Sequence, residues 1–176
     1  MLKKIEKIKR DVHQPLKWHK YNSTNVRNNT NAFSHAIGST VASASQYYRL
    51  GMLSGKKDLK EEYKSIEEVK DLFLADMSAL DLKVERILGT ETKFSLLKSI
   101  QNTELENNQH IVVLFVSVFE GKESGRIKDF HFIRYDEENG WSEKMFRENV
   151  HIFQDILAEW PSVCKRKMVA VYKVTR

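Results

Sequence analysis

Apolar side chains recur at helical spacing in the first half of the chain. Residues 2–10 predict an amphipathic helix, because three-residue spacing separates Leu2, Ile5 and Ile8. The strongest helical pattern spans residues 65–80, where Ser65 and Glu68 form the sequence signature of a capping box. One face of that helix would be apolar along its length: Ile66, Val69, Leu72, Phe73, Met77 and Leu80.

Strand-like patterns follow in the second half. Residues 111–119 form a nearly continuous apolar run rich in β-branched residues, as in a central strand covered on both faces. Residues 129–135 form a second strand, and the Asn139-Gly140 step suits the turn of a hairpin that ends near Lys144. Residues 82–88 and 168–174 are further strand candidates. Because helices come first and most strands afterwards, we predict an α+β fold with N-terminal helices packed on a mostly antiparallel sheet.

The segments between these elements are less regular. Residues 22–31 are dense in Asn, Ser and Thr and predict a loop with helix-capping residues. A helix should begin near Thr30 or Asn31, and it either ends at Gly38 or continues to Tyr48. Two further helices are expected, a short one over residues 94–100 and a longer one over residues 148–160, which Pro161 would end.

Charge divides the chain into two parts. The 176 residues are enough for one domain with a substantial core, and their formal charge is +5. Residues 1–20 hold seven Lys and Arg against two acidic residues, a net of +5, so residues 21–176 are neutral, with 22 charges of each sign. The pattern indicates a basic N-terminal arm (1–20) on a neutral domain (21–176). Nucleic-acid-binding surfaces are basic across a whole face, so nucleic acid is not an expected partner.

Membrane, disulfide and metal functions are not favoured either. No apolar run approaches the ~20 residues that span a bilayer, and the N-terminus lacks the apolar region of a signal peptide, so we expect a cytoplasmic protein. A single cysteine, Cys164, excludes an intrachain disulfide and a multi-cysteine zinc site, and it is expected to be a small apolar filler. The histidines show no metal-ligand spacing, so no cofactor is predicted.

His131 is the candidate for chemistry, because it falls in mid-strand rather than in a loop. Period-two alternation places it on one face with Asp129, Ile133 and Tyr135, and the other face then carries Phe130, Phe132 and Arg134. A rigid strand can hold an imidazole in one orientation, as a catalytic base requires. The alternative is a core histidine with a hydrogen-bonded partner.

Two stretches resemble the papain-like cysteine peptidases, specifically their small bacterial branches. Residues 31–38, Asn-Ala-Phe-Ser-His-Ala-Ile-Gly, match the Asn-Cys step that opens a helix in that family, except at Ala32. Residues 129–132, Asp-Phe-His-Phe with His131, resemble the histidine motif of that family, and Gly140-Trp141-Ser142 fall on the return strand of the hairpin. The resemblance implies a papain-like fold and cleavage of a peptide, isopeptide or glutamine side-chain amide through an acyl-enzyme. A thiolate at a helix N-terminus would be stabilised by the macrodipole and by free N–H groups.

The resemblance implies Ala32 as the nucleophile position and His131 as the base and acid. Glu143 is our candidate for the residue that orients the imidazole, and the hairpin register decides whether it can. A five-residue loop would pair His131 with Glu143, whereas a two-residue Asn139-Gly140 turn would put Ser142 and Lys144 on the His131 face instead. His35, one turn beyond Ala32, is expected on the helix surface.

Alanine has no nucleophile, so two functions stay open. The first is a cysteine peptidase or amidase that acts on a peptide or protein substrate, in a form that lacks its nucleophile at position 32. The second is a non-catalytic protein that keeps the fold and binds a peptide or small ligand. A weaker alternative is docking of an acidic partner on residues 1–20. The peptidase hypothesis predicts that the Cβ of Ala32 faces the His131 imidazole.

Overall fold

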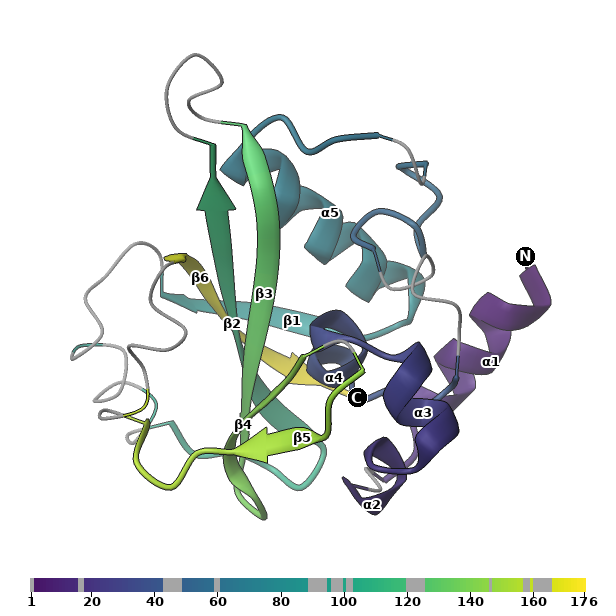
Figure 1. The fold of residues 1–176 in the computed structure, drawn as a ribbon, viewed down its shortest axis with the longest axis vertical. Coiled ribbons are helices and arrows are strands. Elements are labelled where there is room, and N and C mark those ends of the chain that lie inside the picture. Colours follow the sequence, from purple (N-terminus) through teal and green to yellow (C-terminus); the bar gives the residue numbers. More distant parts are fainter. Residues whose placement is uncertain are drawn as a thin grey trace.

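The chain is described by a computed structural model, and its elements are shown in Figure 1. The described residues are 2–15, 18–42, 49–58, 61–88, 95, 100, 103–119, 126–145, 147–156, 159 and 166–176. The helices are α1 (Leu2–Val12), α2 (Trp18–Tyr21), α3 (Thr24–Asn29), α4 (Ala32–Ile37) and α5 (Ile66–Ala79). The strands are β1 (Lys83–Leu88), β2 (Gln109–Val118), β3 (Ile127–Asp136), β4 (Gly140–Lys144), β5 (Val150–Ile152) and β6 (Lys167–Thr175).

The six strands form one antiparallel sheet in the order β1-β6-β2-β3-β4-β5. The prediction of an α+β fold with helices on an antiparallel sheet is confirmed. The apolar run at 111–119 is a central strand, because β2 lies between β6 and β3, and Ile111 to Val116 are at most 1% exposed. The strands predicted at 82–88 and 168–174 are β1 and β6.

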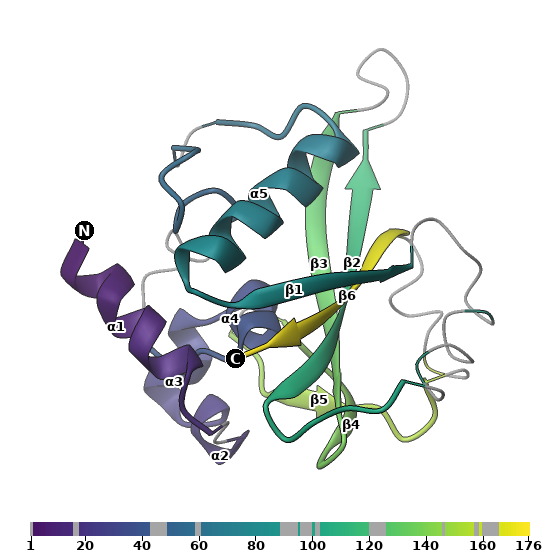
Figure 2. The same ribbon diagram turned by 180° about the vertical axis from the view of Figure 1, so that it is seen from behind.

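Alternation along the strands separates two hydrophobic clusters. We call the side covered by α4 and α5 the helical face; there Phe33 of α4 contacts Phe132 of β3, and Phe73 of α5 stacks on Tyr172 of β6. These side chains belong to one cluster with Val112, Leu114 and Val116 of β2. The intervening residues of the strands form the second cluster on the opposite face: Ile111, Val113, Phe115, Ile133 and Val171. Figure 2 shows α5 alongside β1 from behind.

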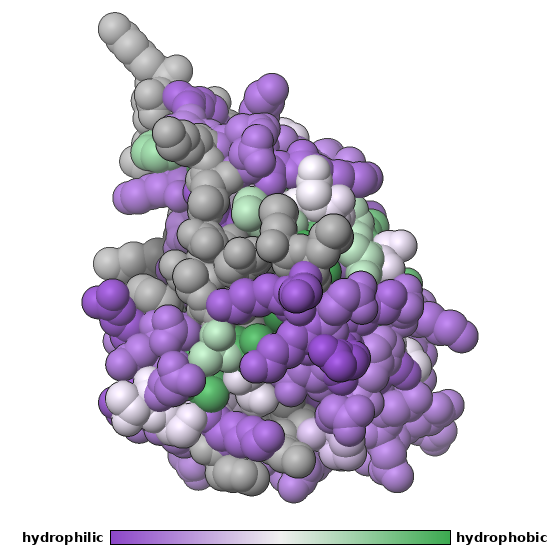
Figure 3. Space-filling view, turned by 90° about the vertical axis from the view of Figure 1, so that its right-hand side faces the viewer, coloured by the Kyte–Doolittle hydropathy of each residue, from purple (hydrophilic) through white to green (hydrophobic). Residues whose placement is uncertain are grey.

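The predicted amphipathic helix at the N-terminus is α1, and it packs on the rest of the chain. Ile8 and Val12 are fully buried in the cluster of the helical face. The Asp11 carboxylate accepts a hydrogen bond from the Thr40 backbone N–H at 2.6 Å, which fixes the segment after α4. The side of the molecule that carries α1 is largely hydrophilic and shows only small hydrophobic areas (Figure 3).

Helix α5 begins at the predicted N-cap Ser65, but the Glu68 carboxylate accepts from Lys64 N and does not close a capping box on Ser65 N. Ser65 Oγ accepts a hydrogen bond from the Glu68 N–H at 3.1 Å. Near the other end, the buried Asp76 carboxylate accepts hydrogen bonds from Gly51 N at 2.7 Å and Ser54 N at 2.8 Å. This carboxylate therefore ties the turn-rich segment 49–58 to α5.

Two predictions of secondary structure are wrong. The loop predicted at 22–31 contains α3, because side chains satisfy its last carbonyl groups: Thr30 Oγ1 donates to Val26 O at 2.6 Å and Asn29 Nδ2 to Asn25 O at 2.9 Å. The helix predicted at 148–160 contains β5, which pairs with the open edge of β4. Among the described residues of this stretch, Ile156 and Glu159 are helical, and Glu159 N donates to Asp155 O.

Some predictions fall outside the described residues. Of the short helix expected over 94–100, only Ser95 and Ile100 are described, and both are helical. Cys164, Trp160 and Pro161 are not described. Within the described ranges, no helix is long and apolar enough to cross a membrane.

Candidate functional site

Helix α4 begins at the position that the sequence predicts. Asn31 is its N-cap, and its Oδ1 accepts hydrogen bonds from Phe33 N at 3.0 Å and Ser34 N at 3.1 Å. Ser34 Oγ accepts one in return from Asn31 N, which completes a capping box. Gly38 ends the helix in a left-handed conformation (φ 76°), so the shorter of the two predicted helices is the correct one. Ala32 is the first residue of α4 and is 8% exposed.

His131 and Glu143 form a close pair. Their Nε2 and Oε2 atoms are 2.8 Å apart, and the His131 side chain is 3% exposed. Neither predicted hairpin register is correct, because Asp136 pairs with Gly140 and a three-residue turn lies between them. Glu143 therefore pairs with Ile133, and it reaches His131 as a diagonal neighbour on the same face.

The sheet separates this pair from Ala32. His131 pairs with Phe115, whose side chain belongs to the cluster on the opposite face, whereas Ala32 belongs to the cluster of the helical face together with Phe132. Since side chains alternate along a strand, His131 points away from the face that α4 covers. A base must come within ~2.6–3.2 Å of the group it deprotonates. The structure thus joins His131 to Glu143 but does not bring Ala32 to them on one face.

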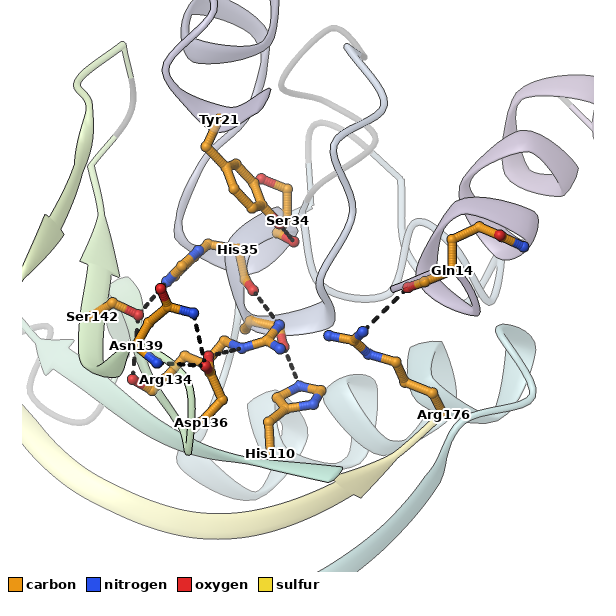
Figure 4. A network of polar contacts seen from close by, with 11 residues as sticks. Gln14, Tyr21, Ser34, His35, His110, Arg134, Asp136, Asn139, Ser142 and Arg176 are labelled. Atoms are coloured by element: carbon orange, nitrogen blue, oxygen red, sulfur yellow. Dashed lines mark hydrogen bonds and ion pairs between the residues drawn. The ribbon is translucent and has the colours of Figure 1, made fainter. Parts of the chain in front are cut away.

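A buried polar cluster lies instead on the helical face, beneath the end of α4 (Figure 4). His35 Nε2 is 3.0 Å from Ser142 Oγ, and Arg134 Nη1 donates to His35 O at 3.3 Å. His110 Nε2 lies 2.8 Å from Ala36 O. The prediction that His35 lies on the helix surface is wrong, because its side chain is fully buried against β4.

Burial fixes the charge state of both histidines. Burial lowers the pKa of His35 well below its ordinary value, and the charges of Arg134 and Lys144 lower it further. Burial likewise lowers the pKa of His110, and the charges of Arg134 and Arg176 lower it further. Both imidazoles are therefore neutral at pH 7. The Nε2 of His110 carries the proton, because its partner is a carbonyl oxygen, and it helps Arg134 to satisfy the last carbonyl groups of α4.

A cavity of about 460 Å³ opens beside this cluster. It is lined by residues from β2, β3, the β3–β4 turn and the segments after α1, before β2 and after β6: Pro15, Glu106, Asn107, Gln109, Arg134, Asp136, Glu137, Glu138 and Arg176. Arg134 and Asp136 are buried and form its inner wall with the partly buried Arg176. The remaining residues are more exposed and form its rim.

The guanidinium groups of Arg134 and Arg176 converge on Gly38. A Cβ atom at Gly38 would lie 3.0 Å from Arg134 Nη1 and 3.1 Å from Arg176 Nη2. Burial lowers the pKa of Arg134 to about 10, and the charge of Arg176 acts in the same direction. Both groups are still protonated at pH 7, so two like charges stand side by side at the inner wall.

Among the described residues that line the inner wall, Asp136 is the one carboxylate, and the charge of Asp11, outside this lining, also acts on Arg176. Asp136 Oδ2 accepts from Arg134 Nε at 3.3 Å, while its Oδ1 accepts from Asn139 N at 3.1 Å and Asn139 Nδ2 at 3.0 Å. Arg176 Nη1 donates to Gln14 O at 3.2 Å, and its buried Nε has no hydrogen-bond partner within the described part of the chain. The inner wall thus carries a net charge of about +1, which favours an anion.

The sequence contained one signal for this site. Alternation placed Arg134 on the same face of its strand as Phe130 and Phe132. An arginine on the same face as two core aromatic residues is expected to be buried, and a buried guanidinium group requires hydrogen-bond or ion-pair partners. No local signal marks Arg176, which reaches the cavity through the pairing of β6 with β2.

Comparison of the chain with protein-family models, with curated proteins and with solved structures gave no match. Among the described residues, no group of three or more His, Cys, Asp or Glu side chains is arranged to hold a metal ion.

Proposed function

We propose that the chain is a non-catalytic ligand-binding protein, and that its cavity binds a carboxylate group of the ligand. The observation that carries this proposal is the convergence of Arg134 and Arg176 at the inner wall, where Asp136 is the one carboxylate among the described lining residues. Guanidinium groups match carboxylates in shape and pair with them through two parallel hydrogen bonds.

The arrangement is costly without an anion. Two adjacent cations at low dielectric repel each other, and the buried Nε of Arg176 has no hydrogen-bond partner among the described residues. A carboxylate in the cavity would reduce the repulsion and offer Arg176 an acceptor. Both guanidinium groups are already held in place by the carbonyl oxygens of His35 and Gln14, so little conformational entropy would be lost on binding.

The peptidase or amidase hypothesis remains a prediction from the sequence resemblance, as does the papain-like fold. Support comes from the Asn31 cap that opens α4 at Ala32 and from the contact of His131 with Glu143. Against it stands the sheet between these two parts, which leaves a nucleophile at position 32 without a base. The binding function requires neither a nucleophile nor a base, so the geometry supports it better.

Titration with sodium acetate tests the proposal, with sodium chloride at equal ionic strength as the reference. We expect saturable shifts of the backbone amide NMR signals of residues 134–140 with acetate and not with chloride. Arg176→Gln should abolish the saturable shifts, because it removes one of the two cations. Arg86→Gln is the matched control, since Arg86 is exposed on β1, and it should leave them unchanged.

The proposal fails if acetate and chloride give the same shifts in the unaltered chain. It also fails if the Arg176→Gln variant responds to acetate as the unaltered chain does.

A further inference from the structure

We infer that the ligand is the carboxy-terminal end of a peptide that carries a basic side chain near that end. This inference rests on the proposed function, and it assigns a ligand class to the same cavity. It comes from the distribution of charge along the cavity wall, which changes sign between the inner wall and the rim.

The inner wall selects for a single negative charge. The described side chains that line this wall are the cations of Arg134 and Arg176 and the carboxylate of Asp136, which sum to a charge of about +1. A carboxylate carries one negative charge and neutralises this wall, whereas a phosphate group carries closer to two at pH 7. The surplus charge of a phosphate would then face the acidic rim.

The rim selects for a positive charge. Three exposed carboxylates surround the opening, from Glu106, Glu137 and Glu138, and the described residues of the rim include no Lys or Arg. Like charges that gather at an opening favour a ligand of opposite sign. A ligand with its carboxylate at the arginines and a cation at this rim would complement both regions.

A peptide end fits this pattern better than a free amino acid does. In a free amino acid the α-ammonium group is attached to the carbon next to the carboxylate. It would therefore lie close to Arg134 and Arg176, which repel it. In a peptide the nitrogen nearest the carboxylate is a neutral amide, and a lysine or arginine side chain can carry its charge outward to the rim. The amide side chains of Asn107 and Gln109 also line the cavity and can pair with peptide groups.

The volume allows such a ligand. About 460 Å³ lies in the range of cavities that hold small ligands. A peptide residue spans at most ~3.6 Å, so the last three residues of a peptide can reach at most ~11 Å from the inner wall.

Four probes separate the contributions of the charges. They are the tripeptide Ala-Lys-Ala with a free carboxylate, the same peptide as its carboxy-terminal amide, Ala-Glu-Ala, and free L-lysine. By calorimetric titration we expect Ala-Lys-Ala to bind, and the amide to bind at least tenfold more weakly because it offers the arginines no charge. Ala-Glu-Ala and L-lysine should also bind at least tenfold more weakly. The rim carboxylates repel the glutamate side chain, and the arginines of the inner wall repel the α-ammonium group of lysine.

Variants of the rim complete the test. In Glu137→Gln/Glu138→Gln the preference for Ala-Lys-Ala over Ala-Glu-Ala should fall severalfold, while the acetate response that depends on Arg176 persists. Glu104→Gln is the matched control, because Glu104 is exposed and does not line the cavity, and it should keep the full preference.

The outcomes distinguish this inference from the proposed function. If acetate gives the Arg176-dependent response but the amide or L-lysine binds as well as Ala-Lys-Ala, the peptide inference is overturned and the carboxylate site stands. Absence of preference for lysine over glutamate overturns it equally. If acetate gives no Arg176-dependent response, both are overturned.

Discussion

Gly38 meets two demands with one residue. Its φ of 76° ends α4, and its missing side chain leaves room for the guanidinium groups of Arg134 and Arg176. Gly55 also has a positive φ, 69°, but a Cβ there would have no neighbour within 4 Å. The two glycines therefore separate backbone strain from crowding at the cavity.

We predict that Gly38→Ala destabilises the protein more than Gly55→Ala does. Either variant should lose about 1 kcal/mol from the positive φ alone. Gly38→Ala should lose a further ~1–3 kcal/mol and weaken the acetate response, because the new methyl group displaces both arginines. Urea unfolding of the two variants measures the difference. Equal losses would show that the arginines do not depend on the space at Gly38.

A second residue-scale prediction concerns Ala32→Cys. Because the sheet lies between position 32 and His131, the rate of reaction of the new thiol with iodoacetamide should have the same pH dependence with and without His131→Ala. The start of α4 can itself lower the thiol pKa below ~8.5, so the dependence on His131 is the informative quantity. The unaltered chain gives the background labelling of Cys164.

A different result would revive the peptidase hypothesis. If the Ala32→Cys thiol reacts at low pH and loses that reactivity with His131→Ala, then His131 acts on position 32. Amide cleavage by the single variant, absent from the double variant, would establish the enzyme.

At the scale of elements, the sequence predicted those structures whose signals are local. Helix α5 carries its own cap at Ser65, α4 carries one at Asn31, and β2 is long and apolar enough to require cover on both faces. The β3–β4 register was not predictable in this way. It depends on a three-residue turn, intermediate between the two considered, and a change of one residue would move Glu143 to the other face.

The error at β5 has the same origin. Val150 and Phe153 have a spacing that fits a helix, yet the backbone at 150–152 bonds to the edge of β4, and Phe153 N donates to Trp141 O. Pairing with a strand already in place outweighed the local preference. No feature within residues 148–160 could reveal that β4 leaves an edge open.

Asp76 gives a prediction for the attachment of segment 49–58 to α5. Burial raises the pKa of its carboxyl group to about 6, even though hydrogen bonds from Ser54 and Gly51 oppose the change. The folded state therefore holds the proton more tightly than the unfolded state, whose Asp pKa is ~3.9. The stability that this group contributes is present at low pH and is lost as the pH rises from about 4 to about 6.

Comparison with Asp76→Asn isolates this effect from other titrating groups. The difference in unfolding free energy, unaltered chain minus variant, should fall by up to about 3 kcal/mol between pH 4 and 6 and stay constant above. Asp71→Asn, an exposed change on the same helix, should give a smaller pH dependence. A difference for Asp76→Asn that does not vary with pH would refute the raised pKa.

At the scale of the whole molecule, the two buried histidines predict sensitivity to acid. Burial lowers the pKa of both His35 and His110 in the folded state, whereas an unfolded histidine titrates near ~6.5. Their contribution to stability is therefore present above pH ~6.5 and is lost as the pH falls below it. With two protons involved, unfolding free energy should fall by up to about 2.7 kcal/mol per pH unit.

Urea unfolding across pH 5–7 measures this slope. His110→Gln should reduce it by about half, because one titrating group is removed. An unaltered slope in His110→Gln would mean that the imidazole of His110 is charged in the folded protein.

The cavity also forms only at the scale of the whole molecule, and for this reason the sequence did not predict it. Its wall combines residues as distant in the sequence as Pro15, Gln109, Arg134 and Arg176. Composition gave a neutral domain after residue 20, and only the folded sheet shows that opposite charges are sorted to the two ends of one cavity.

The strand order also determines when the protein can assemble. Lys83 of β1 and Gln109 of β2 both pair with Thr175 of β6. Strand β1 therefore joins the sheet only after β6, the last strand in the sequence, has paired with β2. Such long closures slow folding, because chain entropy is lost before the contacts are gained. On the ribosome, β2, β3, β4 and β5 can pair with one another first, whereas β1 has no strand to pair with until β6 emerges. The backbone groups of β1 would stay unpaired in the sheet until residues 167–175 leave the exit tunnel.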